Sequence, residues 1–433
     1  MSDFQVLHAF MEGKWMGMVI RDKKLDRLSF RYDPKWIADV ENFPLSLSMP
    51  LATTRHGHKV VETFLWGLLP DHEGILRQWG KKFKVSHRNP FQLLWHVGED
   101  CAGAVQFIRS DQIENWSKKS RPGGIVWMKE SEIVERIQLL LTDYSASRTN
   151  NDIGYFSLAG AQPKTAFFYD PESHRWGIPS GKIPTTHILK PATSAFDSYA
   201  ENEYFCMRLS EMSGLSTASS SLQYFENYPV IIIKRYDRIT ASRGVIRIHQ
   251  EDMCQALGRM PQQKYQSEGG PSLVDIIKLI REYSSDHLVD ELRFIDSIIF
   301  NWLIGGTDAH AKNYSFLIAS GGQVRLAPLY DLSSILPYSR QTNLRKAGMA
   351  MKIGGAYKLR EINAERWEKC ALELGMNTSK LLNRIKKIAT VLPDLSHTLC
   401  KEISSQGINN PIVNQLTEEI SNRSIECRKL IIK

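Results

Sequence analysis

Two polar residues that could do chemistry, Asp308 and Asn313, stand five positions apart in the segment Gly306-Thr-Asp-Ala-His-Ala-Lys-Asn313. The same separation joins the base and the metal-binding asparagine in the phosphoryl-transfer pattern H-R-D-L-x-x-x-N, although the residues before Asp308 differ. Phosphoryl transfer needs metal ions on the phosphates and an acceptor for the proton of the attacking hydroxyl. We therefore predict that Asp308 accepts that proton and that Asn313 binds Mg²⁺. The spacing alone is weakly specific, because a lone polar loop is more often a capped turn.

A second carboxylate, Asp331, is predicted to lie close to Asn313. It follows two short strand patterns, at residues 314–318 and 324–326, which are separated by Gly321-Gly322 and predict a hairpin. The hairpin would return Asp331 towards Asn313. Carboxylate and amide oxygens are ligands that hard cations accept, so the pair would share Mg²⁺ with ATP phosphates.

Lys190 ends a short apolar strand pattern. A lysine at such a place is usually a solvated edge residue. It also lies after a predicted hairpin and before an acidic helix, as does the phosphate-binding lysine of kinases, which pairs with a helical glutamate. Glu203 shares a helical stripe with Tyr199 and Cys206. It is therefore predicted as the partner of Lys190 in preference to Glu201.

The segment Ala159-Gly-Ala-Gln-Pro-Lys164 is predicted as the tip of a hairpin between strands at residues 154–158 and 165–169. It lacks the spacing of a Walker motif. Its small residues could still present backbone N–H groups to phosphates, with Lys164 adding a charge, but a plain β-turn explains the composition equally well. His310 could contact a phosphate, bond within its loop or act as a second base, and the sequence favours none of these.

The chain as a whole has the composition of a globular protein large enough to form a cleft. Its 433 residues exceed the size at which one core keeps growing, so two or more subdomains are expected. With 42% hydrophobic and 24% charged residues, it has no apolar run near the ~20 residues of a membrane-spanning helix. The N-terminus lacks a secretory pattern, so we expect a cytoplasmic protein without membrane association.

Cysteine and charge usage exclude several kinds of site. The six cysteines form no C-x-x-C pair, which argues against disulfides and zinc and favours buried free thiols. The net charge of +8 is spread along the chain. Basic clusters at residues 81–84 and 384–387 are more often solvated faces than nucleic-acid grooves, so direct DNA binding is a minority hypothesis.

Three regions are predicted from the order of elements. Residues 1–115 form a β-rich N-terminal subdomain, and residues 116–245 show the order of a kinase small lobe: hairpin, lysine-bearing strand, helix at 196–212, strand at 230–233 and a polar segment. Residues 246–433 are largely helical, with a buried helix that stops at Gly305-Gly306. The predicted fold is α+β, a two-lobed protein-kinase-like architecture.

Motifs along nearly the whole chain resemble the HipA family of toxin–antitoxin kinases. They are the segments Phe156–Thr165, Thr186–Lys190, Glu201–Tyr204, Arg235–Arg238, His249–Asp252, Gly306–Asn313 and Tyr330-Asp331, together with Phe43–Pro50 and Gly67–Pro70 near the N-terminus. In combination these motifs are highly specific.

The resemblance implies a bacterial serine/threonine protein kinase that uses ATP and Mg²⁺. It implies neutralisation by a small helix-turn-helix antitoxin of the HipB type, and binding to operator DNA, with transcriptional corepression, mainly through that partner. Its implied substrate is an aminoacyl-tRNA synthetase, classically the glutamyl enzyme. Phosphorylation of that enzyme would halt translation and cause growth arrest and persistence.

The resemblance also implies residue roles, with Asp308 as the catalytic base and Ser157 as the autophosphorylation site. The implied nucleotide-contacting residues are Ala159, Gly160, Ala161, Gln162, Pro163, Lys164, Lys190, Lys234, Arg235, Tyr236, His310, Ala311, Lys312, Asn313, Tyr330 and Asp331. A phosphate on Ser157 would add about −1.5 to −2 charges beside the phosphate-binding loop, so self-inactivation is predicted. Lys234 departs from the acidic residue associated with this position, but backbone groups recognise adenine there.

Two alternatives remain open at this point. The protein could phosphorylate a different protein or a small molecule, because an acceptor surface cannot be read from one chain. It could also be a catalytically silent corepressor that strengthens DNA binding by the antitoxin. The complete set of Lys190, Asp308, Asn313 and Asp331 argues against a silent protein.

Overall fold

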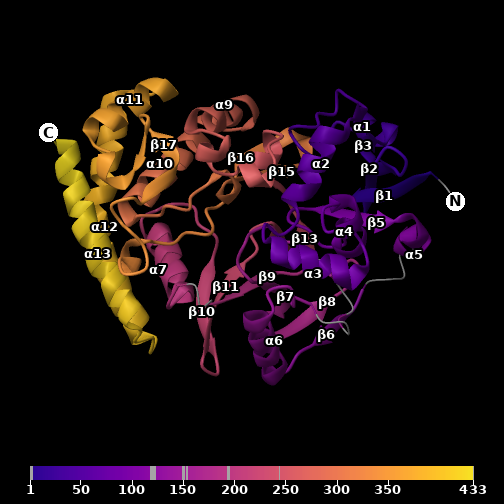
Figure 1. The fold of residues 1–433 in the computed structure, drawn as a ribbon, viewed down its shortest axis with the longest axis horizontal. Coiled ribbons are helices and arrows are strands. Elements are labelled where there is room, and N and C mark those ends of the chain that lie inside the picture. The colour runs from indigo at the N-terminus through magenta and orange to yellow at the C-terminus, as the bar shows by residue number, and fades with distance from the viewer. Residues whose placement is uncertain are drawn as a thin grey trace.

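The computed structural model describes residues 3–117, 123–148, 152, 155–192, 196–242 and 244–432. An N-terminal unit, residues 3–117, lies at one end of the molecule and long C-terminal helices lie at the other, with a sheet between them (Figure 1). The combination of strands and helices is the predicted α+β, two-lobed kinase-like fold.

The N-terminal unit is built on a five-stranded antiparallel sheet in the order β4-β3-β2-β1-β5. Its strands are β1 (Phe4–Met11), β2 (Lys14–Asp22), β3 (Arg27–Tyr32), β4 (Arg55–His56) and β5 (Val105–Arg109). Its helices are α1 (Pro34–Ala38), α2 (His58–Gly67), α3 (Glu73–Phe83), α4 (Pro90–Val97) and α5 (Ile113–Ser117). The sequence analysis identified strands here but not α2, α3 and α4, whose buried faces complete the core of this unit.

A six-stranded sheet in the order β10-β11-β9-β7-β8-β6 occupies the centre. Its strands are β6 (Ile125–Trp127), β7 (Thr165–Asp170), β8 (Arg175–Pro179), β9 (His187–Pro191), β10 (Ser220–Phe225) and β11 (Tyr228–Lys234). Helices α6 (Glu130–Thr142) and α7 (Tyr199–Met212) pack beside it. Strand β11 lies between β10 and β9, and its apolar residues 230–233 are buried in cores on both faces of the sheet, as the sequence predicted.

The hairpin predicted at residues 154–169 is wrong in its first strand. Gly154 lies outside the described residues, and residues 155–158 are irregular. The Ser157 N–H donates to the Asp100 carbonyl oxygen at 2.9 Å, so this backbone bonds to the N-terminal unit. β7 pairs instead with β8 and β9. The 159–164 loop therefore bridges the N-terminal unit and the central sheet.

The C-terminal part consists mostly of helices around one large apolar core. Its helices are α8 (Met253–Ala256), α9 (Leu273–Tyr283), α10 (His287–Ile304), α11 (Ala364–Leu374), α12 (Thr378–Ser405) and α13 (Pro411–Ile432). Short strands here are β12 (Arg238–Ala241), β13 (Gly244–Arg247), β14 (His249–Asp252), β15 (Ser315–Ala319), β16 (Gln323–Leu326), β17 (Gly348–Ile353) and β18 (Ala356–Lys358). As predicted, β15 and β16 form an antiparallel hairpin, to which β14 adds a third strand.

A buried ionic network joins the N-terminal unit to the segment after β11. Asp100 lies 3.0 Å from Arg238, 3.5 Å from Arg247 and 3.6 Å from Arg235. Asp237 pairs with Arg235 at 2.7 Å. Because buried charges are tolerated only when paired and hydrogen-bonded, this network fixes how the two parts dock.

The remaining sequence expectations concern thiols and membranes. All six cysteines are free thiols, and five of them are buried. Within the described ranges, no helix has the length and apolar character needed to cross a bilayer.

Candidate active site

A pocket opens between the central sheet, the N-terminal unit and the loop that follows α10. It is lined by Gly67, Asp71, Ala102, Leu158, Ala159, Gly160, Ala161, Gln162, Lys164, Ile188, Lys190, Tyr199, Ile233, Lys234, Arg235, Tyr236, Asp237, Gln250, Asp252, Gln255, Lys264, Asp308, His310, Lys312, Asn313, Ser315, Tyr330 and Asp331. Most site residues predicted from the sequence line this pocket. The exceptions are Ser157, Pro163, Glu203 and Ala311.

Lys190 lies near the end of β9, buried between two carboxylates. Its Nζ is 2.7 Å from Oε1 of Glu203 on α7 and 2.6 Å from Oδ1 of Asp331. Burial disfavours its ammonium, but the charges of Asp331 and Glu203 outweigh that effect and raise the pKa of Lys190. The side chain is therefore a fixed cation in the pocket. Glu203 is the helical partner that the sequence analysis preferred.

Asp331 follows β16 and has a left-handed backbone, with φ of +59°. Such a conformation is costly for a residue with a side chain and is held by its surroundings. Burial opposes ionisation of its carboxyl, but Lys190 and Lys164 outweigh burial and hold the pKa of Asp331 well below its usual range. Asp331 is therefore an anion at neutral pH.

The loop after α10 presents Asp308 and Asn313. Helix α10 ends because Gly305 adopts a left-handed conformation, with φ of +69°. The Asn313 Nδ2 donates to the backbone oxygen of Asp308 at 2.9 Å. The Asp308 side chain is exposed at the pocket and accepts a hydrogen bond at Oδ1 from the Tyr265 hydroxyl. A substrate hydroxyl has access to this carboxylate.

The donors around the pocket fit Mg²⁺ held jointly with phosphates. Because Nδ2 of Asn313 is turned towards the loop backbone, its Oδ1 is the amide atom that could bind a cation. Asp331 contributes a carboxylate. The described residues contain no group of three or more His, Cys, Asp or Glu side chains that could hold a metal alone. Mg²⁺ typically uses one or two protein oxygens together with substrate phosphates, and this pocket supplies such a set.

The loop at residues 159–164 is closed by a contact between its two ends, and Lys164 gives it a cationic side chain. Lys164 Nζ donates to the Ala159 carbonyl oxygen at 2.7 Å, folding the side chain across the loop. A Cβ at Gly160 would lie 2.3 Å from that Nζ, and the φ of Gly160 is +108°, so this position requires glycine. Burial, reinforced by the charge of Lys190, lowers the pKa of Lys164 to about 8.

His310 and Lys312 differ in what they offer a ligand. The Nδ1 atom of His310 is buried and has no hydrogen-bond partner among the described residues. Burial lowers the pKa of His310, so the ring is neutral near pH 7 and available for hydrogen bonding. Lys312 instead turns its ammonium to Asp71 of the N-terminal unit, at 2.6 Å.

The segment after β11 divides its side chains between the pocket and the interior. Lys234 is exposed, whereas the Arg235 guanidinium enters the buried ionic network. The side chain of Arg235 is thus an internal structural group, although the residue borders the pocket. The Tyr236 hydroxyl donates to Gln250, and its ring lies 5.7 Å from that of Tyr330.

Several pocket residues were not predicted from the sequence as site residues. Those with polar side chains are Asp71, Tyr199, Asp237, Gln250, Asp252, Gln255, Lys264 and Ser315, and Tyr265 touches Asp308 beside them. Asp71 directly follows the Gly67–Pro70 motif, which was the available signal. Ser157, by contrast, is fully buried and donates through Oγ to the Leu68 carbonyl oxygen at 2.7 Å.

The fold and this arrangement of lysine, carboxylates and asparagine define a two-lobed kinase-like protein. Residues 7–108 match the family model for the HipA N-terminal domain, and residues 156–395 match the HipA-like C-terminal domain. The protein Y4mE of Sinorhizobium fredii is 32% identical over 97% of this chain and 98% of its own length. This chain belongs to the HipA family of kinases.

Two further matches, one of sequence and one of structure, are to HipA of Shewanella oneidensis. Its serine/threonine-protein kinase toxin HipA is 28% identical over 87% of this chain and 85% of its own length. A solved structure of HipA with HipB and operator DNA matches with a TM-score of 0.82, at 24% identity, over 98% of both chains. At that identity the structural likeness shows the shared fold.

Proposed function

We propose that this protein is a serine/threonine protein kinase toxin that transfers the γ-phosphate of ATP to a protein hydroxyl. The observation that carries the proposal is that one pocket gathers the four side chains of the phosphoryl-transfer set, Lys190, Asp308, Asn313 and Asp331. The named activity of the Shewanella oneidensis relative supports it. A catalytically silent corepressor would not need Lys190 held as a buried cation between two carboxylates.

Each group has a proposed task in the transfer. Lys190 binds the α- and β-phosphate oxygens, and Lys164 adds positive charge from the 159–164 loop. Asp331 and the amide oxygen of Asn313 hold Mg²⁺, which when bound neutralises charge on the phosphates. Asp308, exposed beside them, accepts the proton of the attacking hydroxyl.

The proposed acceptor is a serine of an aminoacyl-tRNA synthetase, with the glutamyl enzyme as the first candidate. Phosphorylation there would stop translation and arrest growth in the cytoplasm. A HipB-like antitoxin is the proposed partner, with operator DNA bound through it. The Shewanella oneidensis complex of HipA, HipB and operator DNA supports this assembly. Phosphoproteomics of cells expressing the protein without antitoxin would identify the acceptor, whether a synthetase or another protein.

The kinase proposal is tested with labelled ATP, Mg²⁺ and the Asp308→Asn variant. We expect the wild type to label itself or the synthetase, and the variant to lose about 10²- to 10⁴-fold in rate, because a general base typically contributes that much. If the wild type transfers no phosphate, or the variant matches it in labelling and in growth arrest, the proposal fails.

Autophosphorylation of Ser157 is proposed as a self-inactivating step. The Ser157 hydroxyl is completely buried, so it can reach ATP only if residues 155–164 leave their place. A phosphate with about −1.5 to −2 charges would not fit back into that buried position. The 159–164 loop follows directly, so the ATP site would lose its phosphate-binding wall.

Mass spectrometry and a preincubation assay test this step. Wild-type protein incubated with ATP and Mg²⁺ should acquire phosphate on Ser157 and lose activity in proportion, whereas Ser157→Ala should stay active. Loss of activity in Ser157→Ala at the wild-type rate would contradict self-inactivation through this serine.

A further inference from the structure

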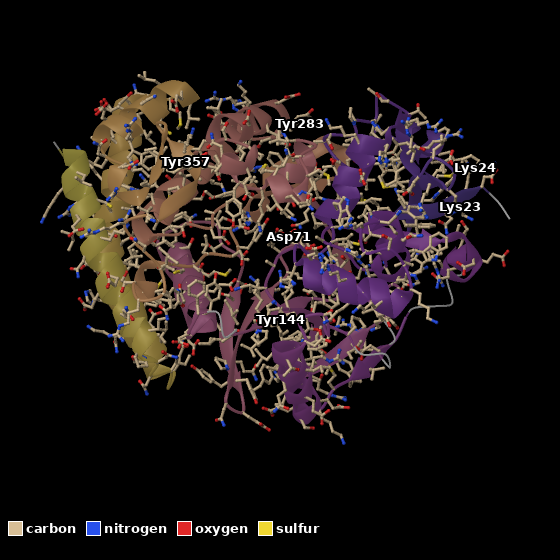
Figure 2. The ribbon with its side chains drawn as sticks, in the orientation of Figure 1. Lys23, Lys24, Asp71, Tyr144, Tyr283 and Tyr357 are labelled. Atoms are coloured by element: carbon tan, nitrogen blue, oxygen red, sulfur yellow. The ribbon has the colours of Figure 1, made fainter. Side chains whose placement is uncertain are left out.

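Asp71 belongs to the N-terminal unit but lies inside the nucleotide pocket. It follows α2 and the Leu68-Leu-Pro70 segment and precedes α3. Figure 2 shows it near the centre of the molecule, where the N-terminal unit meets the remaining chain. Its side chain is only 10% exposed. A carboxylate in this position needs partners, and the identity of those partners indicates its task.

The contacts of Asp71 reach three separate segments of the site. Its Oδ1 accepts a hydrogen bond from Lys312 Nζ at 2.6 Å, and its Oδ2 lies 3.5 Å from Lys264 Nζ. Its backbone N–H donates to the Gly160 carbonyl oxygen at 3.1 Å. One residue thus connects the catalytic loop, the segment that carries Tyr265 and the 159–164 loop.

Lys312 is held at its side chain by Asp71 and at its backbone by Tyr330. Its side chain is 3% exposed, and its own carbonyl oxygen accepts a hydrogen bond from the Tyr330 hydroxyl at 2.7 Å. Lys312 immediately precedes Asn313, so the position of its side chain constrains the candidate metal ligand.

We propose that Asp71 is a positioning residue for phosphoryl transfer, through which the N-terminal unit holds Lys312 and with it the catalytic loop. This inference rests on the proposed kinase function. Asp71 anchors the loop that presents Asp308 and Asn313, and its N–H fixes the opposite wall at Gly160. The N-terminal unit then contributes a positioning residue to the active site in addition to packing beside it.

Docking of the N-terminal unit does not depend on Asp71. The Asp100 network joins the two parts elsewhere, and Ser46 donates to Glu251 Oε2 at 2.5 Å in a third place. Moreover, Oδ2 of Asp71 has no hydrogen-bond partner within the described part of the chain. Its charged neighbour there is Lys264 at 3.5 Å, so this oxygen keeps the capacity to accept a hydrogen bond at the pocket wall.

The test compares Asp71→Asn, Lys312→Met and their double variant with Glu41→Gln, a control at an exposed carboxylate of the N-terminal unit that accepts a hydrogen bond from Ser320, away from the pocket lining. We expect Asp71→Asn to lower kcat by about 10- to 100-fold, because small displacements of catalytic groups have effects of that size. The double variant should be no slower than the slower single variant, because both changes remove one contact. Glu41→Gln should stay within about twofold of wild type, because substitutions at exposed positions away from such features have small effects.

Hydrogen exchange provides a second readout that needs no kinase activity. In Asp71→Asn, amides of residues 306–313 should exchange about tenfold faster than in wild type, while melting temperature and exchange in the β1–β5 sheet stay unchanged. In Glu41→Gln, residues 306–313 should exchange at the wild-type rate.

The outcomes separate this inference from the kinase proposal. An inactive wild type counts against the proposed function, whereas unchanged exchange at residues 306–313 in Asp71→Asn overturns the positioning role whatever the activity. An active wild type with normal kcat in Asp71→Asn also overturns it. So does a melting temperature that falls with global loss of protection, since that result makes Asp71 a structural residue.

Discussion

Lys190 and Asp331 form an ion pair in the pocket, with Nζ 2.6 Å from Oδ1. The two residues come from β9 and from the segment after β16, which are 141 positions apart in the sequence. Glu203 binds the same ammonium from α7. Because Lys190 is buried between these carboxylates, its position is fixed by two different parts of the fold.

The first prediction concerns Glu203→Gln, which keeps the size of the side chain and removes its charge. Lys190 would lose one charge-assisted hydrogen bond, worth about 1.5–3 kcal/mol, so kcat/KM for ATP should fall about 10- to 100-fold. Steady-state kinetics with varied ATP measure this loss.

Glu201→Gln is the matched control for that variant. Glu201 is buried on the same helix but accepts hydrogen bonds from Tyr224 and Asn410, away from the pocket. An equal loss in Glu201→Gln would mean that stability of α7, and not the pairing of Lys190, explains the effect.

The second prediction concerns Tyr265→Phe. The Tyr265 hydroxyl donates to Oδ1 of Asp308 and its ring packs against that of His310, at 5.1 Å between centroids. Loss of this hydrogen bond removes one constraint on Asp308, the proposed general base, so kcat should fall about tenfold with little change in KM for ATP. Tyr357→Phe, at a tyrosine of β18 that does not line the pocket and that Figure 2 shows away from Asp71, should leave kcat unchanged. An increase in kcat for Tyr265→Phe would instead mark the tyrosine as an obstruction.

The third prediction is a pH dependence of ATP affinity that arises from Lys164. Its pKa is lowered to about 8, so its positive charge is present below that pH and is lost above it. Since phosphates bind the charged form, ATP affinity should be highest below about pH 8 and should fall as the pH rises towards 9.5. Calorimetric titration with ATP between about pH 7.5 and 9.5 measures how the affinity changes with pH. Lys164→Met should bind ATP more weakly, and its ATP affinity should not change with pH over this range. If the wild type and Lys164→Met show the same pH dependence, Lys164 is not its source.

The fourth prediction concerns stability. Asp100→Asn would leave Arg235, Arg238 and Arg247 without their shared carboxylate in the interior. Breaking a buried ionic network by removing one partner typically costs about 3–5 kcal/mol, which chemical denaturation would detect as a lower midpoint. Asp111→Asn, at an exposed carboxylate that pairs with Arg109, should change stability by less than about 0.5 kcal/mol. Comparable midpoints for the two variants would show that the network contributes little.

The sequence by itself determined the local features of the site. Spacing along one loop brought Asp308 and Asn313 together, because the two residues are five positions apart in the short segment, residues 305–314, between the end of α10 and the start of β15. Strand and helix periodicity identified β9, α7, α10 and the β15–β16 hairpin, and helical spacing distinguished Glu203 from Glu201. Family motifs then indicated the HipA-like fold before any contact was known.

Only the tertiary structure decided which distant groups meet. The expected strand at residues 155–158 is irregular because its polar groups bond to the N-terminal unit, a choice that local propensity does not encode. Arg235 and Lys312 look alike in sequence as cations near phosphates, yet each turns to a buried carboxylate, Asp237 and Asp71 respectively. Burial makes such pairings compulsory, and which residues are buried together is a property of the whole fold.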